Sequence, residues 1–340
     1  MANGAFTQFQ PTDIINSVDS QTGTLWSNNV PRLTEVHTSS VQSTSNSGQY
    51  FVHVYQTSST DPTAAVQFDI AYADEQGSGS LLYNNAVPKK SPSLTNFGQY
   101  RSMILEDENK NFIFGSSTNI LTADNYWVIS IDRARYKEQL FAGSLNLALS
   151  GSGGKIHLTD DSKDNPVNRF LGSSKFYQLI SGSNGTAGTL ANNGYVANSG
   201  SYGLVFPELG TILLNPQALA QSININATRT STPISTNNKT LIDSIVLGAS
   251  FGLNSEETIT SDYIFVRSRN SEFNYSENPS FISGSTGEVV HNEFINHPQV
   301  YATTVGMYND SNELLAVAKL SRPLLKDFTK ESLVRVKLDF

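Results

Sequence analysis

Short runs in which apolar and polar residues alternate dominate this chain, and a period of two predicts β-strands. In one of them, Val66, Phe68, Ile70 and Tyr72 alternate with polar or small residues, as expected for a strand with one buried face. Strands rich in β-branched and aromatic residues and bounded by turn residues are predicted at 50–55, 64–72, 101–105, 111–115, 126–131 and 144–149, with shorter islands at 155–159, 175–180 and 202–206. The pattern predicts a mainly β fold of short antiparallel strands in β-sandwich-like domains.

The end of the chain repeats this pattern. From Tyr301 to Met307 every second residue faces one side, a polar turn occupies 309–312, and an apolar run returns over 314–320, which predicts a hairpin. Residues 333–338 then alternate apolar and charged, as in a strand with one solvated face. We therefore expect three strands to form one element that closes the chain.

Helix signals are few. Residues 215–223 begin with Asn215 at an N-cap position and Pro216 in the first turn, and residues 238–248 end at Gly248, so both segments are predicted helices. The charged segment 132–140 could form one or two helical turns that begin near Asp132. Helix content should be small.

Composition divides the chain into three regions. Residues 1–48 carry scattered apolar anchors among polar turns and predict an extended N-terminal arm, either ordered on a neighbouring subunit or floppy. Residues 49–203 predict a β-rich domain with long loops, rich in Gly, Ser and Asn, over 151–203. Residues 204–340 predict a β-rich C-terminal region that ends in the three-strand element.

The surface chemistry is amide and hydroxyl rather than ionic. Ser, Thr and Asn make up 104 of the 340 residues, charged residues only 15%, and the net charge is −8. Because binding to the phosphates of a nucleic acid requires clustered Lys and Arg, we expect no nucleic-acid partner. Cysteine is absent, so the chain has no disulfide framework. We see no secretory signal at the start and no run of about 20 apolar residues, and expect a soluble product made in a cytoplasm, without a membrane partner.

Several short motifs were tested for catalytic chemistry. The segment from Gly248 to Gly252 (GASFG) fits the nucleophile elbow of hydrolases, with Ser250 as nucleophile, but it follows a predicted helix and precedes no helix. The alternative is a glycine-lined turn. Carboxylates cluster at 106–108 and at 256–257, but adjacent carboxylates on a strand point to opposite sides and cannot flank one sugar bond. We expect no catalytic residues and no enzyme.

Cofactor and metal motifs are equally incomplete. The stretch from Gly151 to Lys155 lacks the first glycine and the Ser or Thr of a phosphate loop, and a hairpin loop accounts for it. The run from Asp160 to Asn165 (DDSKDN) offers oxygens for a cation such as calcium but lacks the Gly and Glu of a helix-loop-helix site, so it is either a cation site or an acidic surface turn. The five histidines show no zinc spacing. We assign no cofactor-binding or metal-binding residues.

Five stretches carry a resemblance to a known class of proteins: 128–140 (VISIDRARYKEQL), 267–281 (RSRNSEFNYSENPSF), 301–310 (YATTVGMYND), 313–323 (ELLAVAKLSRP) and 334–340 (VRVKLDF). With them, the chain after about residue 64 resembles virion structural proteins of large contractile-tailed phages, especially the T-even-like myoviruses of cyanobacteria. The resemblance implies a structural role in the tail or baseplate, and it brings no motif of functional residues.

The sequence and this resemblance together lead us to expect a non-enzymatic structural component of a tailed-phage virion, assembled in the host cytoplasm. It would act as a wedge, collar or fibre-attachment component, binding other virion proteins and itself as a homo-oligomer. A neck, collar or capsid-decoration role is the alternative within this class. A virion-borne hydrolase or a module that binds host glycans is the alternative outside it.

Overall fold

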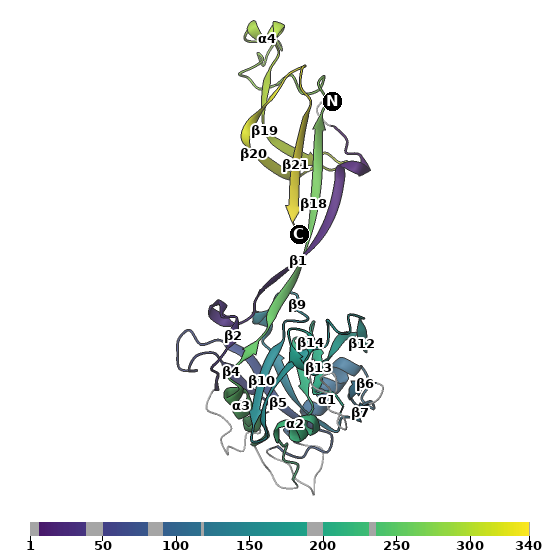
Figure 1. Cartoon of the computed structure of the whole chain (residues 1–340). Helices are drawn as coiled ribbons and strands as arrows, with labels where there is room; N and C mark the ends of the chain where they lie inside the picture. Colours follow the sequence, from purple (N-terminus) through teal and green to yellow (C-terminus); the bar gives the residue numbers. More distant parts are fainter. Residues whose placement is uncertain are drawn as a thin grey trace. The chain divides into compact units, whose positions relative to one another are not determined.

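The computed structural model describes residues 7–38, 50–80, 91–116, 119–188, 200–230 and 236–339. It divides into two compact units: unit 1 comprises residues 1–20 and 258–340, and unit 2 comprises residues 21–257 (Figure 1). The borders fall within two strands, β1 (Ile14–Thr24) and β18 (Asn254–Ser268). Strands make up 44% of the structure and helices 16%, which confirms the predicted mainly β fold.

A large antiparallel sheet forms the body of unit 2. Its strand order is β2-β17-β10-β11-β13-β15-β16-β8-β5-β4-β3, with β12 and β14 each paired to β13. The strands are β2 (Arg32–Leu33), β3 (His37–Thr38), β4 (Val52–Tyr55), β5 (Val66–Asp74), β8 (Asn125–Ile131), β10 (Asn146–Gly151), β11 (Gly154–Asp160), β12 (Arg169–Leu171), β13 (Ser174–Ser183), β14 (Thr186–Ala187), β15 (Gly203–Phe206), β16 (Thr211–Leu214) and β17 (Phe251–Gly252). The hairpin of β6 (Ile113–Ser116) and β7 (Asn119–Thr122) is separate, and β9 (Gln139–Leu140) pairs with β18.

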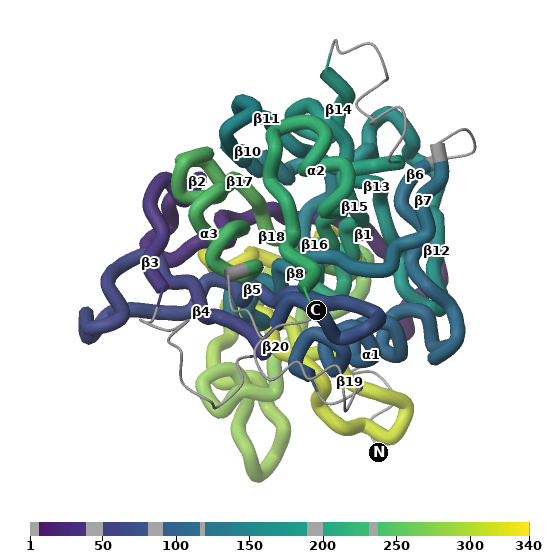
Figure 2. Tube along the Cα trace, turned by 90° about the horizontal axis from the view of Figure 1, so that it is seen from below, coloured from purple at the N-terminus to yellow at the C-terminus, as the bar shows by residue number. Residues whose placement is uncertain are grey.

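Helices cover both faces of this sheet. The helix α1 (Pro92–Leu105) packs against β5, α2 (Pro216–Ile223) packs against β11 and β8, and α3 (Thr236–Gly248) packs against β10 and β5 (Figure 2). The Asn215 side chain accepts hydrogen bonds from the first-turn N–H groups of α2, as the sequence predicts, and α3 matches the second predicted helix.

Two hydrophobic cores result. The larger joins one face of the sheet to α2 and α3, with Trp26, Trp127 and Phe251 among its buried rings. The smaller joins the other face to α1, where Phe97 packs against Tyr126 with ring centroids 5.2 Å apart. Unit 2 therefore has a fully developed interior.

One local prediction is wrong. Residues 101–105 end the helix α1 instead of forming a strand, because Ser91 caps the helix and buried residues recur with helical spacing at Asn96, Phe97 and Ile104. This helical spacing is not visible in a five-residue window. The prediction for 132–140 is confirmed: the segment contains one short 3₁₀ turn (Arg133–Arg135), and Asp132 caps it by accepting the Ala134 N–H.

The three predicted regions do not match the compact units. Residues 25–38 belong to unit 2, where Leu25, Trp26 and Leu33 are buried, so this part of the predicted arm is ordered by its own chain. The expected border at 203/204 lies within β15, which pairs with β13 and β16. The described residues of the segment 151–203 include the strands β11 to β14. Residues 1–6 and 39–49 of the arm, 189–199 of the loops and Phe340 lie outside the described residues.

Unit 1 consists of a sheet in the order β1-β18-β21 and a hairpin of β19 (Val300–Tyr308) and β20 (Leu314–Lys326) (Figure 1). The predicted hairpin is confirmed. The last strand, β21 (Ser332–Asp339), pairs with β18 over Ser261 to Ser268 and not with the hairpin, so the expected three-strand element is wrong. Ile264, Met307 and Val336 form the small core between hairpin and sheet. A four-residue helix, α4 (Glu293–Asn296), lies in the long connection from β18 to β19.

Candidate functional site

A groove lies within unit 1, between the β19–β20 hairpin, β18, β21 and the segment before β1. Its volume is 730 Å³, within the range of about 300–1,000 Å³ typical of sites that hold a ligand. Apolar side chains, among them Phe9, Val266, Val305, Met307 and Leu324, line the groove together with a similar number of polar and charged ones.

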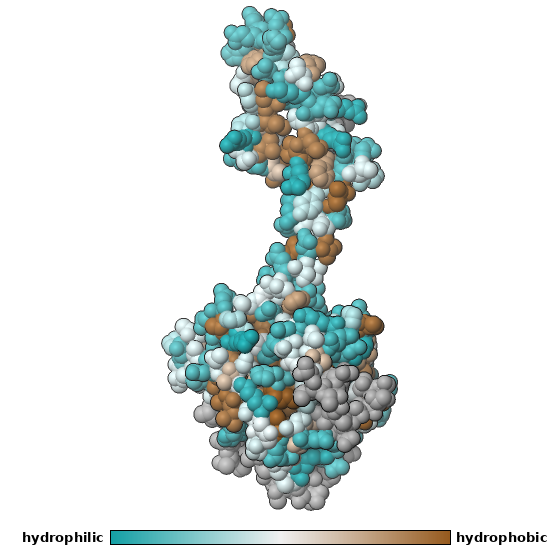
Figure 3. Space-filling model, viewed as in Figure 1, coloured by the Kyte–Doolittle hydropathy of each residue, from teal (hydrophilic) through white to brown (hydrophobic). Residues whose placement is uncertain are grey.

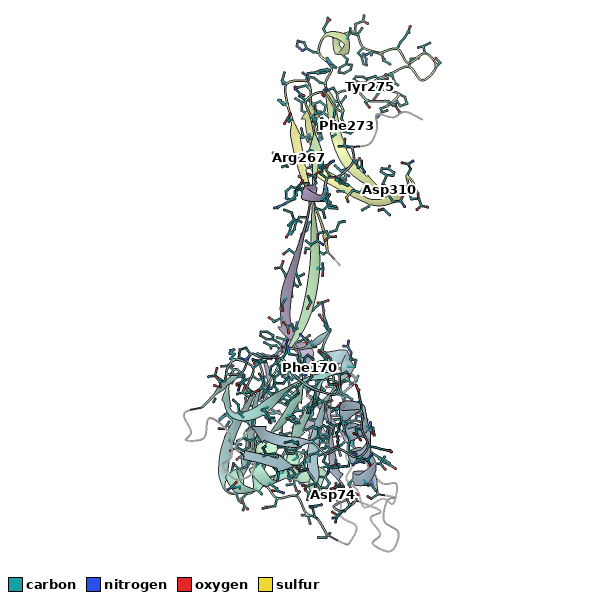
Figure 4. The ribbon with its side chains drawn as sticks, turned by 90° about the vertical axis from the view of Figure 1, so that its right-hand side faces the viewer. Asp74, Phe170, Arg267, Phe273, Tyr275 and Asp310 are labelled. Carbon is teal, nitrogen blue, oxygen red and sulfur yellow. The ribbon has the colours of Figure 1, made fainter. Side chains whose placement is uncertain are left out.

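Phe273 stands at the groove in a strained conformation. Its φ is 53°, a left-handed value that bulky residues rarely adopt, and its ring is 43% exposed (Figure 4). Such strain persists only where the surroundings impose it, and it concentrates at functional sites.

The buried Lys326 imposes that conformation on the loop. Only 2% of Lys326 is exposed. Its Nζ donates to the carbonyl oxygen of Asn270 at 3.0 Å, to Asn274 Oδ1 at 2.9 Å and to the carbonyl oxygen of Asp327 at 3.1 Å. Asn274 also donates to the Asn270 carbonyl at 2.7 Å. These bonds fix both flanks of Phe273.

Charged groups mark the rim of the groove. Arg267 on β18 lies 3.5 Å from Asp13, measured from Nε to Oδ1, and its side chain remains largely exposed. Asp310 lies in the turn of the hairpin (Figure 4). The rim is polar and the interior apolar, which is the usual anatomy of a protein-binding surface.

Unit 1 exposes far more apolar surface than it buries. Among the described residues, four apolar side chains of this unit are buried, whereas fourteen large ones are exposed. Figure 3 shows brown apolar patches in the middle of this unit among teal hydrophilic and white intermediate residues. The exposed residues are Ile14, Ile15, Val18, Phe273, Tyr275, Val290, Ile295, Tyr301, Tyr308, Leu314, Leu315, Val317, Phe328 and Leu333. Contiguous apolar exposure is typical of interaction surfaces.

Part of this surface belongs to the outer face of the hairpin. Val317 lies opposite Gly306 in the ladder. A Cβ at Gly306 would lie 3.0 Å from the ring of Tyr308 and 3.4 Å from Leu314, so both side chains cover this glycine. With Leu315 they form the outer apolar patch of the hairpin: Tyr308, Leu314, Leu315 and Val317.

The segment around Ser250 is a turn. The helix α3 ends at Gly248, Ala249 adopts φ 51°, and β17 starts at Phe251, so the order is helix to strand and not the strand to helix of a nucleophile elbow. A Cβ at Gly248 would lie 1.9 Å from the carbonyl oxygen of Ala148. The glycine is therefore required by packing.

The glycines at 151–154 form a hairpin turn, as the sequence predicts. Gly151 pairs with Gly154 at the end of the β10–β11 ladder. The Gly153 N–H donates to the carbonyl oxygen of Ile223 at 3.1 Å. A Cβ at Gly151 would lie 2.2 Å from the same oxygen, so this turn packs against the end of α2.

The sequence predicts that residues 160–165 form either an acidic surface turn or a cation site. The structure shows a different arrangement. Asp160 and Asp161 are buried, and their oxygens accept hydrogen bonds from protein N–H groups. Asp160 accepts from the Gly143 N–H at 2.9 Å, and Asp161 accepts from the Gln178 N–H at 2.8 Å and from Arg169 at 2.5 Å. Burial raises the pKa of the Asp160 carboxyl. Both side chains therefore anchor the turn to the sheet.

The other candidate residues have structural contacts. Glu106 accepts a hydrogen bond from the Ser173 N–H at 3.2 Å, and Glu257 forms an ion pair with Lys137. His53 lies 2.6 Å from Asp69, measured from Nδ1 to Oδ1. Within the described ranges, no group of three or more His, Asp or Glu side chains is placed to hold a metal ion.

Sequence reasoning missed the groove and the role of Lys326. The groove is built from segments at both ends of the chain, which no local pattern connects. A signal for Lys326 was present: it follows Leu324 and Leu325 in a strand. A lysine in an apolar run has two interpretations, a solvated face or a buried anchor, and burial decides between them.

Two findings concern the chain as a whole. None of the helices that the structure describes is long and apolar enough to cross a membrane. Comparisons of the chain with protein-family models, with curated proteins and with solved structures found no match.

Proposed function

We propose that this protein is a structural component of a tailed-phage virion that works by assembly, with unit 1 as its assembly module. The observation that carries the proposal is the contrast between the two units. Among the described residues, unit 2 buries 46 apolar side chains and exposes nine large ones, whereas unit 1 buries four and exposes fourteen large ones. A unit of this kind gains its missing burial from a partner.

The resemblance of five stretches to virion proteins of contractile-tailed phages supports the same proposal. Two of the five, 301–310 and 313–323, form the β19–β20 hairpin, and a third, 267–281, includes Phe273. The similarity therefore includes the segments that line the groove. We propose a place in the tail or baseplate, with other virion proteins and further copies of this chain as partners.

The experiment places charged residues in the outer apolar patch of the hairpin and follows the variant protein in phage particles. The variant carries Leu315→Asp and Val317→Asp, and the matched control carries Val246→Asp and Leu247→Asp on the exposed side of α3 in unit 2. We expect the unit 1 variant to be made in the host but to be missing from purified particles, while the control is incorporated. Normal incorporation of the unit 1 variant would contradict assembly through this patch.

An enzyme and a glycan-binding module are the alternatives. Esterase activity that disappears in Ser250→Ala would favour the first, and glycan binding that depends on unit 1 aromatic residues would favour the second. The turn geometry at Ser250 and the hydrogen-bonded carboxylates at 160 and 161 favour neither.

A further inference from the structure

The strand edges of unit 1 differ in how they are protected. An exposed strand edge invites pairing with another chain, and proteins discourage this with charges, prolines and irregularities. In unit 1, β1, β21, β19 and β20 each have one edge to which no other strand of the described residues is paired. Protective residues occur on three of these strands: Asp19 on β1, Lys319, Arg322 and Pro323 on β20, and Arg335 and Lys337 on β21.

The fourth strand, β19, lacks the charges and prolines, and its irregularities are two register shifts in the ladder with β20. Its nine residues, Val300–Tyr308, include no charged residue and no proline. Most of the strand is exposed, with Tyr301 at 64% and Tyr308 at 43%. A long, uncharged and apolar edge of this kind is expected to pair with another strand.

The sequence of β19 is complementary to itself in reverse. Turning the strand about the bond between Thr304 and Val305 brings Tyr301 opposite Tyr308 and Ala302 opposite Met307, and it brings Thr303 opposite Gly306.

The faces of β19 also match under this reversal. Met307 is buried and Val300, Ala302 and Val305 are half-buried, whereas Tyr301, Thr303, Thr304, Gly306 and Tyr308 are exposed. In a strictly alternating strand, this reversal would pair residues of opposite faces. The β19–β20 ladder shifts register between Ala302 and Thr304, and this shift changes which residues of β19 share a face. Outside the central step, every pair therefore joins residues of the same face, as antiparallel pairing requires.

We propose that two copies of this chain associate through antiparallel pairing of their β19 strands about a twofold axis at the Thr304–Val305 bond. The two hairpins then form one four-stranded sheet in the order β20-β19-β19-β20. This inference rests on the proposed function, because it names a partner for unit 1: a second copy of the chain. The pairing hydrogen-bonds both open edges and joins Tyr301 of each copy to Tyr308 of the other.

The first experiment measures self-association of the full chain by sedimentation at several concentrations. We expect a dimer for the natural chain and at least a tenfold rise in the dimer dissociation constant for Thr303→Lys, which places a charge on the paired edge. The matched control is Ser321→Lys, which adds the same charge at an exposed position of β20 and should leave the constant within twofold.

The second experiment tests the register and does not depend on that variant. The chain has no cysteine, so introduced thiols are the only ones present. The double variant Tyr301→Cys/Tyr308→Cys should form a covalent dimer under mild oxidation, which a reductant dissolves. Neither single variant should form this dimer, because the two copies of the same residue would lie about 23 Å apart along the strands at ~3.3 Å per residue.

Three results would overturn the inference: a monomer at every concentration, a dimer that Thr303→Lys leaves intact, or cross-linking by a single variant as fast as by the double one. Each of them leaves the proposed function standing if the protein is still incorporated into phage particles. Absence from the particles would remove the proposed function and leave the dimer unaffected.

Discussion

At the residue scale, the groove depends most on Lys326. Its ammonium group is buried and donates to three neutral oxygens, two of which belong to the loop that carries the strained Phe273. Burying a cation is costly unless all its hydrogen bonds are made. The three bonds show that this condition is met by local oxygens and not by a carboxylate.

Replacing this lysine should release the loop. In Lys326→Met, Asn274 Oδ1 loses its lysine donor, and the carbonyl oxygens of Asn270 and Asp327 each lose one of two donors, which we expect to cost about 2 kcal/mol locally. Hydrogen exchange followed by mass spectrometry should then show about thirtyfold faster exchange over residues 269–275. The exposed Lys330→Met is the control and should change nothing. Unchanged protection in Lys326→Met would show that other contacts hold the loop.

A second residue-scale prediction concerns unit 2. Asp74 is buried and lies 2.6 Å from Arg229, which also lies 2.6 Å from Asp124. Arg229→Met leaves a buried carboxylate without its partner and should lower the free energy of unfolding by about 3 kcal/mol. Urea unfolding followed by tryptophan fluorescence measures this, because both tryptophans belong to unit 2.

The control for Arg229 is an exposed ion pair. Lys239 and Asp243 lie four residues apart on α3 with both side chains largely solvated. Lys239→Met should change the same free energy by less than about 0.5 kcal/mol. Equal effects of the two substitutions would contradict the assigned role of Arg229.

At the element scale, two substitutions in the turn after α3 distinguish a packing role of this turn from a catalytic one. Gly248→Ala should destabilise unit 2 by about 2 kcal/mol or more, because the added Cβ meets the carbonyl oxygen of Ala148. Ser250→Ala should leave the same urea unfolding curve unchanged and remove no esterase activity. Loss of an activity in Ser250→Ala with unchanged stability would show that the turn interpretation is wrong.

The turn from β11 to β12 supports a further prediction. Because the Asp160 and Asp161 oxygens already accept N–H groups, neither added calcium nor a chelator should shift the thermal unfolding midpoint by more than about 1 °C. A rise with calcium that disappears in Asp160→Asn would restore the cation site.

The elements that the sequence predicts correctly carry their signal locally. The cap at Asn215, the Gly151–Gly154 turn and the hairpin near Asn309 each depend on a few adjacent residues. The elements it mispredicts depend on distant contacts. β21 pairs with β18 across more than sixty residues, and α1 is recognised only over its full length, so a window at 101–105 sees a strand. The groove was not predictable for the same reason.

At the scale of the whole molecule, the chain separates into a unit with a complete interior and a unit that leaves its apolar surface open. Unit 2 can be understood from its own sheet, helices and two cores. Unit 1 has a small core around Ile264, Met307 and Val336, a groove, and an uncharged strand edge to which no described strand is paired. These features together are the physical basis for proposing an assembly protein.

The measurement that tests this account most directly is quantitative mass spectrometry of purified particles of the phage that we propose encodes the chain. It expresses the copies of this protein relative to the tail-sheath and major capsid proteins. We predict a small multiple of three or six copies per particle, as a tail or baseplate component requires. Hundreds of copies would move the protein to the head as a decoration, and absence from the particle would contradict the account.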